Sequence, residues 1–173
     1  MKTKRDTSKE VAEIIYNQID NYSEHVRILE PSAGEGNLID YISSKLGRKT
    51  NIDVIELNTD KANTLEGKGY NLIGRDYMNT VITKPYNLIL ACPPFKDNMN
   101  LDHIQKMYGD VVNGGTIITL CNTQWIIDNN EKSIKFREFL SKINYTMMML
   151  PDNSFIEKDK TVPTMLIKIK KYV

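Results

Sequence analysis

The sequence feature that most constrains the fold is a short apolar segment, residues 26–29, that runs directly into the loop EPSAGEG at residues 30–36. Apolar residues then recur at helical spacing from Leu38 onward. A buried strand, a glycine turn and a helix in this order predict a βαβ unit whose turn lies at the carboxyl edge of a parallel sheet. Because Gly34 and Gly36 permit backbone angles and close approaches that a side chain would block, this turn is a candidate ligand site.

Segments with strand and helix patterns alternate along the rest of the chain. We expect strands at residues 26–29, 51–57, 70–74, 86–91, 116–120, 145–150 and 164–169, and helices at residues 9–21, 58–68 and 101–108, after the glycine loop, and around residues 134–140. This order predicts an α/β protein with a Rossmann-like, doubly wound, mostly parallel seven-stranded sheet, helices on both faces and an antiparallel last strand. Since the sequence contains no internal repeat and no linker, we expect residues 1–173 to form one domain.

Composition argues against several classes of protein. Apolar residues make up 40% of the chain, charged residues 26%, and the formal net charge is +1, which neither supports nor excludes binding to nucleic acid. No apolar run reaches the roughly 20 residues of a membrane span, and the charged N-terminus lacks a signal-peptide core, so we expect a cytoplasmic protein without membrane association. Cys92, Cys121, His25 and His103 are too scattered for a metal site, and both histidines are expected at the surface or at helix ends.

The acidic residues around the glycine loop indicate which ligand it binds. Glu56 lies 20 residues after Gly36, at the end of the second predicted strand, where a carboxylate commonly binds ribose hydroxyls. A dinucleotide is disfavoured, because Ile39 stands where a third glycine is required and because Glu30 and Glu35 would repel a pyrophosphate. Carboxylates suit a ligand with a sulfonium and an ammonium group, and S-adenosylmethionine carries both and no phosphate.

Six segments then resemble, in order, the motifs of class I S-adenosylmethionine-dependent methyltransferases, most closely the gamma class of adenine amino-methyltransferases. They read TSKEVAEII, ILEPSAGEGNLIDYI, NIDVIELN, GRDYMN, YNLILACPPF and LPDNSFIEKDKTVPTMLIKIKK. This resemblance covers nearly the whole chain and implies S-adenosylmethionine as the cofactor and nucleic acid as the substrate, with DNA favoured over RNA. It also implies that residues 1–25 form a leading segment that closes over the methionine part of the cofactor.

The same resemblance implies which residues hold the cofactor. Asp76 would accept a hydrogen bond from the adenine amine, with Tyr77 beside the adenine ring, and Glu56 would bind the ribose. The full cofactor-binding set carried over from the motifs is Thr7, Glu30, Pro31, Ser32, Ala33, Gly34, Glu35, Gly36, Glu56, Leu57, Asp76, Tyr77 and Cys92.

The catalytic motif of this family is Asn, Asp or Ser followed by Pro-Pro and then Tyr or Phe, and the matching residues here are Cys92, Pro93, Pro94 and Phe95. An amine conjugated to a base ring is a poor nucleophile. The side chain at the first position and the carbonyl of the first proline accept its two N–H bonds, which frees the nitrogen lone pair for the methyl group. The aromatic residue stacks on a base flipped out of its helix.

Cys92 departs from the family pattern, since a thiol is only a weak acceptor. Three interpretations remain open: Cys92 acts as a weak or thiolate acceptor while Pro93 carries much of the task; the site is degenerate and binds without turnover; or Cys92 is a covalent nucleophile. Cys121 follows the fifth predicted strand and is expected near Cys92, with both cysteines reduced.

The target side of the site is less defined. Phe155 is expected to line the target pocket or, equally, to lie in the core, and Trp125 is either a base-contacting residue or, preferably, core. A separate target-recognition domain is not expected, so selectivity would come from short loops at residues 96–100 and 124–133 or from a partner subunit. The competing hypotheses are methylation of adenine in DNA or RNA, methylation of a protein amide, and a catalytically silent binding subunit.

Overall fold

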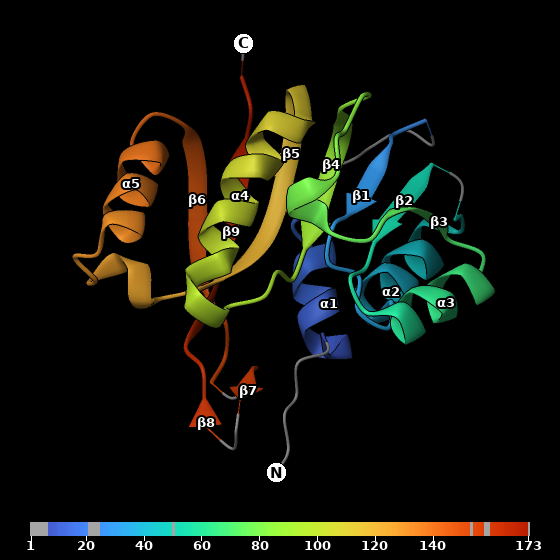
Figure 1. Cartoon of the computed structure of the whole chain (residues 1–173), viewed down its shortest axis with the longest axis horizontal. Coiled ribbons are helices and arrows are strands. Elements are labelled where there is room, and N and C mark those ends of the chain that lie inside the picture. The colour runs from blue at the N-terminus through green and yellow to red at the C-terminus, as the bar shows by residue number, and fades with distance from the viewer. Residues whose placement is uncertain (1–6, 21–24, 50, 153, 158–159, 173) are drawn as a thin grey trace.

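The structure is a computed structural model that describes residues 7–20, 25–49, 51–152, 154–157 and 160–172. Its main element is a seven-stranded sheet with the order β3-β2-β1-β4-β5-β9-β6 (Figure 1). The strands are β1 (Ile28–Glu30), β2 (Ile52–Ile55), β3 (Asn71–Gly74), β4 (Tyr86–Ala91), β5 (Val111–Asn122), β6 (Asn144–Met149) and β9 (Thr164–Lys170). The strands from β3 to β5 pair in parallel, and β9 pairs antiparallel with both β5 and β6.

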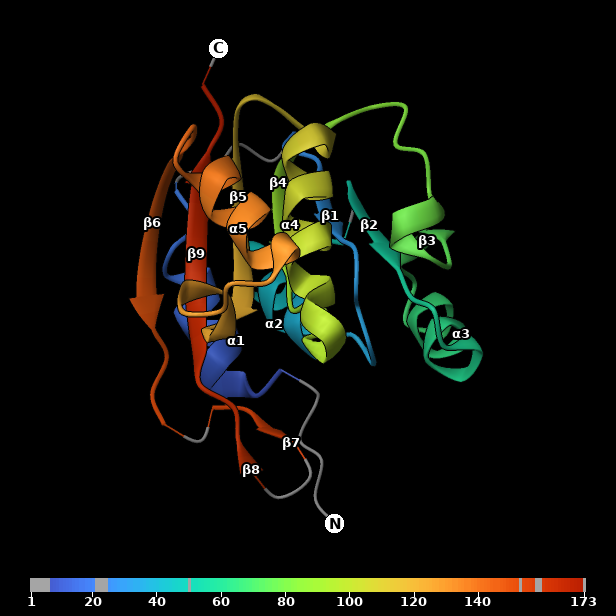
Figure 2. The ribbon, with the colours of Figure 1, turned by 60° about the vertical axis from the view of Figure 1, so that its left-hand side comes forward.

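The helices cover both faces of this sheet (Figures 1 and 2). They are α1 (Lys9–Tyr16), α2 (Asn37–Leu46), α3 (Thr59–Gly67), α4 (Met99–Asp110) and α5 (Glu131–Leu140). Apolar side chains from α1, α2 and α3 form one buried cluster with the sheet, and those from α4 and α5 form a second cluster on the opposite face. The predicted Rossmann-like fold is therefore confirmed, including its antiparallel last strand.

Strand β4 shows how one segment supplies both clusters. Leu88 and Leu90 belong to the cluster beneath α1 and α2, whereas Ile89 and Ala91 belong to the cluster beneath α4 and α5. This alternation follows from the period of two in a β-strand, and all four residues are buried because helices cover both faces. An uninterrupted apolar run in the sequence is thus a strand at the centre of the sheet.

Several element boundaries differ from those predicted. Helix α1 begins after the predicted cap, Ser8, whose hydroxyl accepts a hydrogen bond from the Val11 N–H (3.3 Å), but it ends at Tyr16 instead of residue 21. Strand β5 begins at Val111, ahead of the glycine pair expected to precede it, and its pairing with β4 shifts register between Tyr86 and Leu88. A short hairpin of β7 (Ile156–Glu157) and β8 (Lys160–Thr161) was not predicted, since strands of two residues carry no periodic signal.

The position of β9 also refines the prediction. The last strand is antiparallel as expected, but it lies inside the sheet between β5 and β6, and β6 forms the edge. Between β1 and β4 the strand order reverses, so the connections that follow these two strands run toward opposite edges of the sheet. This position is the switch point of the sheet. Doubly wound sheets bind their ligands at this point.

The glycine turn that enters α2 provides a test of the fold. Gly36 has φ +89°, and a Cβ at this position would lie 2.8 Å from Cδ2 of the buried Leu65, whereas Gly47 has φ +66° and open space around it. We expect Gly47→Ala to lower the free energy of unfolding by about 1–2 kcal/mol through backbone strain alone. Gly36→Ala should lose about 1–3 kcal/mol more, because the methyl group overpacks the core. Urea titrations of both variants check this, and equal losses would contradict it.

Candidate functional site

A cavity of about 560 Å³ lies at the carboxyl edge of the sheet, between the ends of β1, β2, β3 and β4 and the start of α4. Its lining includes most of the residues predicted from the motifs: Pro31, Ser32, Gly34, Glu56, Leu57, Asp76, Tyr77, Cys92, Pro93, Pro94, Phe95 and Phe155. The parallel strands bring these residues together, since each of them follows or ends a strand on the same edge. The volume lies within the range of pockets that hold a small molecule or cofactor.

The glycine loop forms a tight turn that is hydrogen-bonded to the next strand. The Ala33 N–H donates to the Ile55 carbonyl (3.0 Å), and the Gly36 N–H donates to the Ala33 carbonyl (2.8 Å). Gly34 has φ +58° and Gly36 φ +89°, both in the left-handed region that glycine adopts without strain. The loop backbone is thereby held beside the end of β2, where Glu56 begins the next turn.

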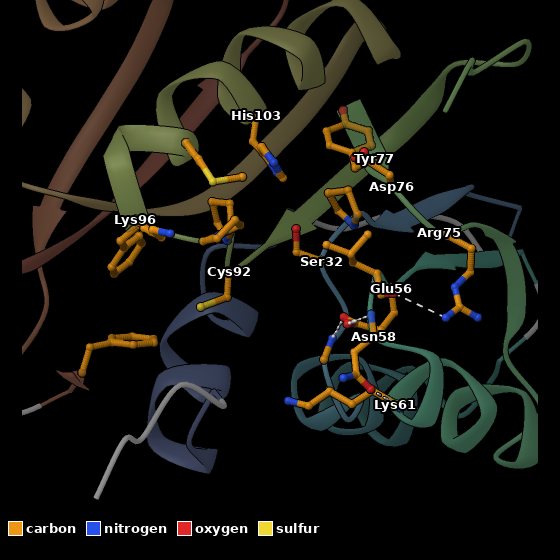
Figure 3. A pocket seen from close by; sticks show the side chains of 18 of the residues that line it. Ser32, Glu56, Asn58, Lys61, Arg75, Asp76, Tyr77, Cys92, Lys96 and His103 are labelled. Atoms are coloured by element: carbon orange, nitrogen blue, oxygen red, sulfur yellow. Dashed lines mark hydrogen bonds between the residues drawn. The ribbon is translucent and has the colours of Figure 1, made fainter. Parts of the chain in front are cut away.

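Glu56 has the geometry expected of a ribose-binding carboxylate. Its Oε2 accepts a hydrogen bond from the Gly34 N–H (2.7 Å), and its Oε1 accepts one from the Asn58 N–H (2.8 Å) (Figure 3). A carboxylate has about four acceptor sites, so further acceptor capacity remains on the side that faces the cavity. The adjacent Leu57 is 71% exposed and presents an apolar surface to the same cavity.

Asp76 and Tyr77 form the cavity wall beyond Glu56. The Asp76 carboxylate accepts hydrogen bonds from the Met78 N–H (3.0 Å) and from Nδ2 of Asn79 (2.6 Å), so it is oriented by the short helical turn η1 (Tyr77–Asn79) that it caps. The Tyr77 ring is buried, and its hydroxyl donates to Asp110 on α4 (2.8 Å). Both side chains are therefore held rigidly at one end of the cavity.

The catalytic motif lies directly after β4, and all four of its residues line the cavity. Cys92 is half-buried, and the Phe95 ring packs on the Phe155 ring with their centroids 5.7 Å apart. Phe155 is buried in the core and also lines the cavity, so the two positions considered for it do not exclude each other. Cys92, the first residue of the motif, lies on the side of the cavity away from Asp76 (Figure 3).

Several predicted residues do not line the cavity. Glu30 is 1% exposed and packs toward α2, and burial raises the pKa of its carboxyl well above its usual range. The side chain of Glu35 is exposed, and Thr7 is buried outside the lining. Ala33 and Gly36 also lie outside the lining but form the hydrogen bonds of the glycine turn. Successive side chains of β1 point to opposite faces of the sheet, so Glu30 faces the same side as Ile28, which α1 and α2 cover. Among the acidic residues used to infer the ligand, Glu56 is therefore the one that lines the cavity.

Trp125 belongs to the core and not to the target side. It is 4% exposed, and its ring packs edge-on against Phe136 of α5 with centroids 5.0 Å apart. The short turn η3 (Gln124–Ile126) that carries Trp125 directs the indole inward, beneath α5. A base-contacting role for Trp125 is thus corrected by the structure.

The cavity also contains Lys96 and Met99 from the loop at residues 96–100 that was expected to contribute selectivity, and five residues that were not predicted as site residues: Asn58, Lys61, Arg75, His103 and Val162. His103 was expected at the surface or at a helix end, yet it is buried, and desolvation lowers its pKa. Arg75 follows directly after β3, and Asn58 lies three residues after β2, so nearness to a strand end is the signal that could have indicated these two. His103 lies one helical turn into α4, and only the phase of that helix reveals that it faces the cavity.

An amide network supports the loop after the catalytic motif. Asp97 and Asn98 have φ +52° and +54°, and Nδ2 of Asn122 donates to Oδ1 of Asn98 (3.2 Å). Nδ2 of Asn100 donates to the Cys121 sulfur (2.9 Å). Cys121 therefore takes part in holding this strained loop. Cys92 and Cys121 form no disulfide bond within the described residues, and their reduced state stays a prediction.

Among the described residues there is no cluster of histidine, cysteine or acidic side chains that could hold a metal ion. In the same part of the chain, no helix combines the length and the apolar character needed to cross a bilayer.

Comparison with known proteins shows the fold and not the family. No protein-family model and no curated protein matches the chain. Among solved structures, it resembles a class I S-adenosylmethionine-dependent methyltransferase from Listeria monocytogenes with a TM-score of 0.75 and 16% identity, over 96% of this chain and 61% of that one. This chain thus spans about three fifths of that relative's length.

Two further structures share the fold. One is an rRNA methylase from Streptococcus thermophilus, with a TM-score of 0.58 and 14% identity over 95% of each chain. The other is the plantazolicin methyltransferase in complex with a desmethyl-plantazolicin analogue and S-adenosylhomocysteine, with a TM-score of 0.64 and 13% identity over 94% of this chain and 82% of that one. The fold of this chain is therefore that of S-adenosylmethionine-dependent methyltransferases.

The two thiols should differ sharply in reactivity. In the native protein we expect a thiol reagent to modify Cys92, which lines the cavity, and to leave Cys121 unmodified. Cys121 is fully buried, and burial raises its pKa to about 12, so that almost no reactive thiolate is present at neutral pH. Peptide mass mapping after partial labelling checks this. Equal labelling of both cysteines without denaturant would contradict the described packing.

Proposed function

We propose that this protein is an S-adenosylmethionine-dependent methyltransferase that methylates the exocyclic amine of adenine in DNA. The observation that carries the proposal is that Glu56, Asp76 and the motif from Cys92 to Phe95 line one cavity, within a fold shared with methyltransferases. These three motifs lie far apart in the sequence, and each supplies a different part of such a reaction. RNA is the less favoured substrate.

The residues of the cavity fit the proposed cofactor. Glu56 would accept hydrogen bonds from the ribose hydroxyls, and Asp76 would accept one from the adenine amine, with Leu57 and Tyr77 as apolar walls. The open backbone at Gly34 leaves room for the methionine part to pass along the turn. When bound, the cofactor supplies a methyl group on a positively charged sulfur. Glu56 and Asp76 line the cavity together with Lys61, Arg75 and Lys96, so recognition of the cofactor would rest on individual hydrogen bonds and not on the net charge of the lining.

The methyl acceptor would occupy the other side of the cavity. There the Pro93 carbonyl, and more weakly the Cys92 sulfur, accept the two N–H bonds of an amine, and Phe95 stacks on the attached base. With the cofactor bound, these two acceptors would direct the nitrogen lone pair toward the methyl group, and the proton released from the methylated nitrogen would pass to water. Most of the rate acceleration would come from holding the methyl donor and the amine acceptor in line. The transfer needs no metal ion.

Two further functions follow from Cys92. A thiol in place of a strong acceptor favours a protein that binds cofactor without turnover, and the half-buried position of Cys92 in the cavity suits either role. Methylation of a protein amide requires a rigid acceptor at this position, and the thiol makes that function the least favoured of the three. If DNA is the target, sequence selectivity would come from loops at this edge, such as Lys96–Asn98, or from a partner subunit.

Cofactor binding can be tested through Glu56. Calorimetry should show that S-adenosylhomocysteine binds the wild type and that Glu56→Ala weakens binding by about tenfold or more, since hydrogen bonds to a charged group are lost. Glu56→Gln should fall between the two. Glu66→Ala, on the exposed face of α3, is the matched control and should leave affinity unchanged. Wild-type protein that fails to bind millimolar ligand would contradict the proposed function.

Catalysis can be tested by restoring a strong acceptor. We expect Cys92→Asn to raise methyl transfer to unmethylated DNA by about tenfold, because an amide oxygen accepts an N–H bond better than a thiol does. Transfer of a radiolabelled methyl group to DNA, RNA and protein extract identifies the substrate class in the same experiment. If only the variant is active, the natural protein is a binding subunit. Loss of activity in Cys92→Asn would instead show that the thiol itself takes part in the reaction.

A further inference from the structure

His103 is a buried polar side chain in the cavity to which the proposed reaction assigns no role. It projects from α4 into the cavity on the side where Asp76 and Tyr77 lie (Figure 3). The residue is 6% exposed, and its Nδ1 is fully buried without a hydrogen-bond partner. The Tyr77 ring packs edge-on against the imidazole, with centroids 5.4 Å apart. Because Nδ1 has no exposed surface, the imidazole nitrogen that a ligand in the cavity can reach is Nε2, for which no hydrogen bond within the described residues is found.

We propose that His103 recognises the base of the cofactor through a hydrogen bond that an imidazole N–H donates to a ring nitrogen of adenine. This hydrogen bond helps the cavity to select adenosine. This inference rests on the proposed function, because it assumes that the cavity holds an adenosyl ligand. It deepens that function by naming a residue on α4, far from the glycine loop, that determines which base is accepted.

The chemistry of the two side chains is complementary to adenine. Asp76 is an acceptor and matches the exocyclic amine, which is a donor. The ring nitrogens of adenine are acceptors and require a donor, and a neutral imidazole offers one N–H. A base with a carbonyl in place of the exocyclic amine would set two acceptors against each other at Asp76. Where the facing ring nitrogen of that base carries a hydrogen, it would also set two donors against each other at His103, and both mismatches cost affinity because the groups are desolvated.

The surroundings keep the imidazole neutral. Burial lowers the pKa of His103, and this effect exceeds those of the neighbouring charges. Those charges are Asp102 and Lys106 on α4 and Asp76 on the facing turn, while Tyr77 contributes an aromatic ring and no charge. A neutral imidazole can donate to a neutral base without adding a further positive charge to a cavity that Lys61, Arg75 and Lys96 already line and that must also admit a sulfonium group.

The test is a matrix of variants and ligands measured by calorimetry. The ligands are S-adenosylhomocysteine and its analogues in which N1, N3 or N7 of adenine is replaced by C–H. We expect His103→Leu to bind S-adenosylhomocysteine about tenfold more weakly than the wild type, and His103→Gln, whose amide also donates, to stay within about threefold. One analogue should bind the wild type about tenfold more weakly and lose nothing further in His103→Leu.

Controls separate this role from packing. Met99→Leu changes the shape of the same wall of the cavity without changing any hydrogen bond, and it should affect all four ligands equally. Thermal unfolding of each variant without ligand shows whether it folds. Equal loss for all four ligands in His103→Leu, or no loss for any, overturns the inference. If the wild type binds none of the ligands, the proposed function has failed as well, and that result is distinct from the other two.

Discussion

The hydrogen bond from the Gly34 N–H to the Glu56 carboxylate is the interaction on which the rest of the site depends. It joins the turn after β1 to the turn after β2, and the bond between Ala33 and Ile55 reinforces the same junction. Because Glu56 also fixes the first residue of the turn into α3, one side chain sets the spacing between two ligand-facing loops. The carboxylate proposed to bind ribose is therefore oriented before any ligand arrives, which reduces the ordering that binding requires.

The sheet order explains why distant motifs meet at this edge. The order reverses between β1 and β4, and the strands on either side point the same way, so the loops after β1, β2, β3 and β4 all open into one cavity. Helix α4 then closes the cavity from one face, while Phe155, on the segment that leads into the β7–β8 hairpin, packs on Phe95 at the other side. The two sides of the cavity are thus built from different parts of the chain on one sheet.

Much of this arrangement could be predicted from the sequence, because it depends on local patterns. The glycine turn, Glu56 and the motif at Cys92 each follow an apolar run, and the carboxyl ends of parallel strands share one edge. The surroundings of single side chains were harder to predict. Glu30, like Glu56, was predicted to bind the cofactor, but the alternation of side chains along β1 directs Glu30 toward α1 and α2. Glu56 lies just beyond the end of β2, and its carboxylate turns back to the glycine loop. Trp125 lies in the core, the preferred of its two alternatives, whereas His103 was misplaced because the phase of α4 decides its burial.

The place of β9 inside the sheet has a consequence for how the protein is made. This strand comes last along the chain, yet it pairs with β5 on one side and β6 on the other, over seven and six residue pairs respectively. Until β9 emerges from the ribosome, β6 and α5 have no partner strand through which to join the sheet, and the exposed edge of β5 remains open to other chains. During synthesis there is therefore a stage at which strands β1 to β5 can already pair while β6 cannot yet join the sheet. At that stage the chain depends most on protection from aggregation.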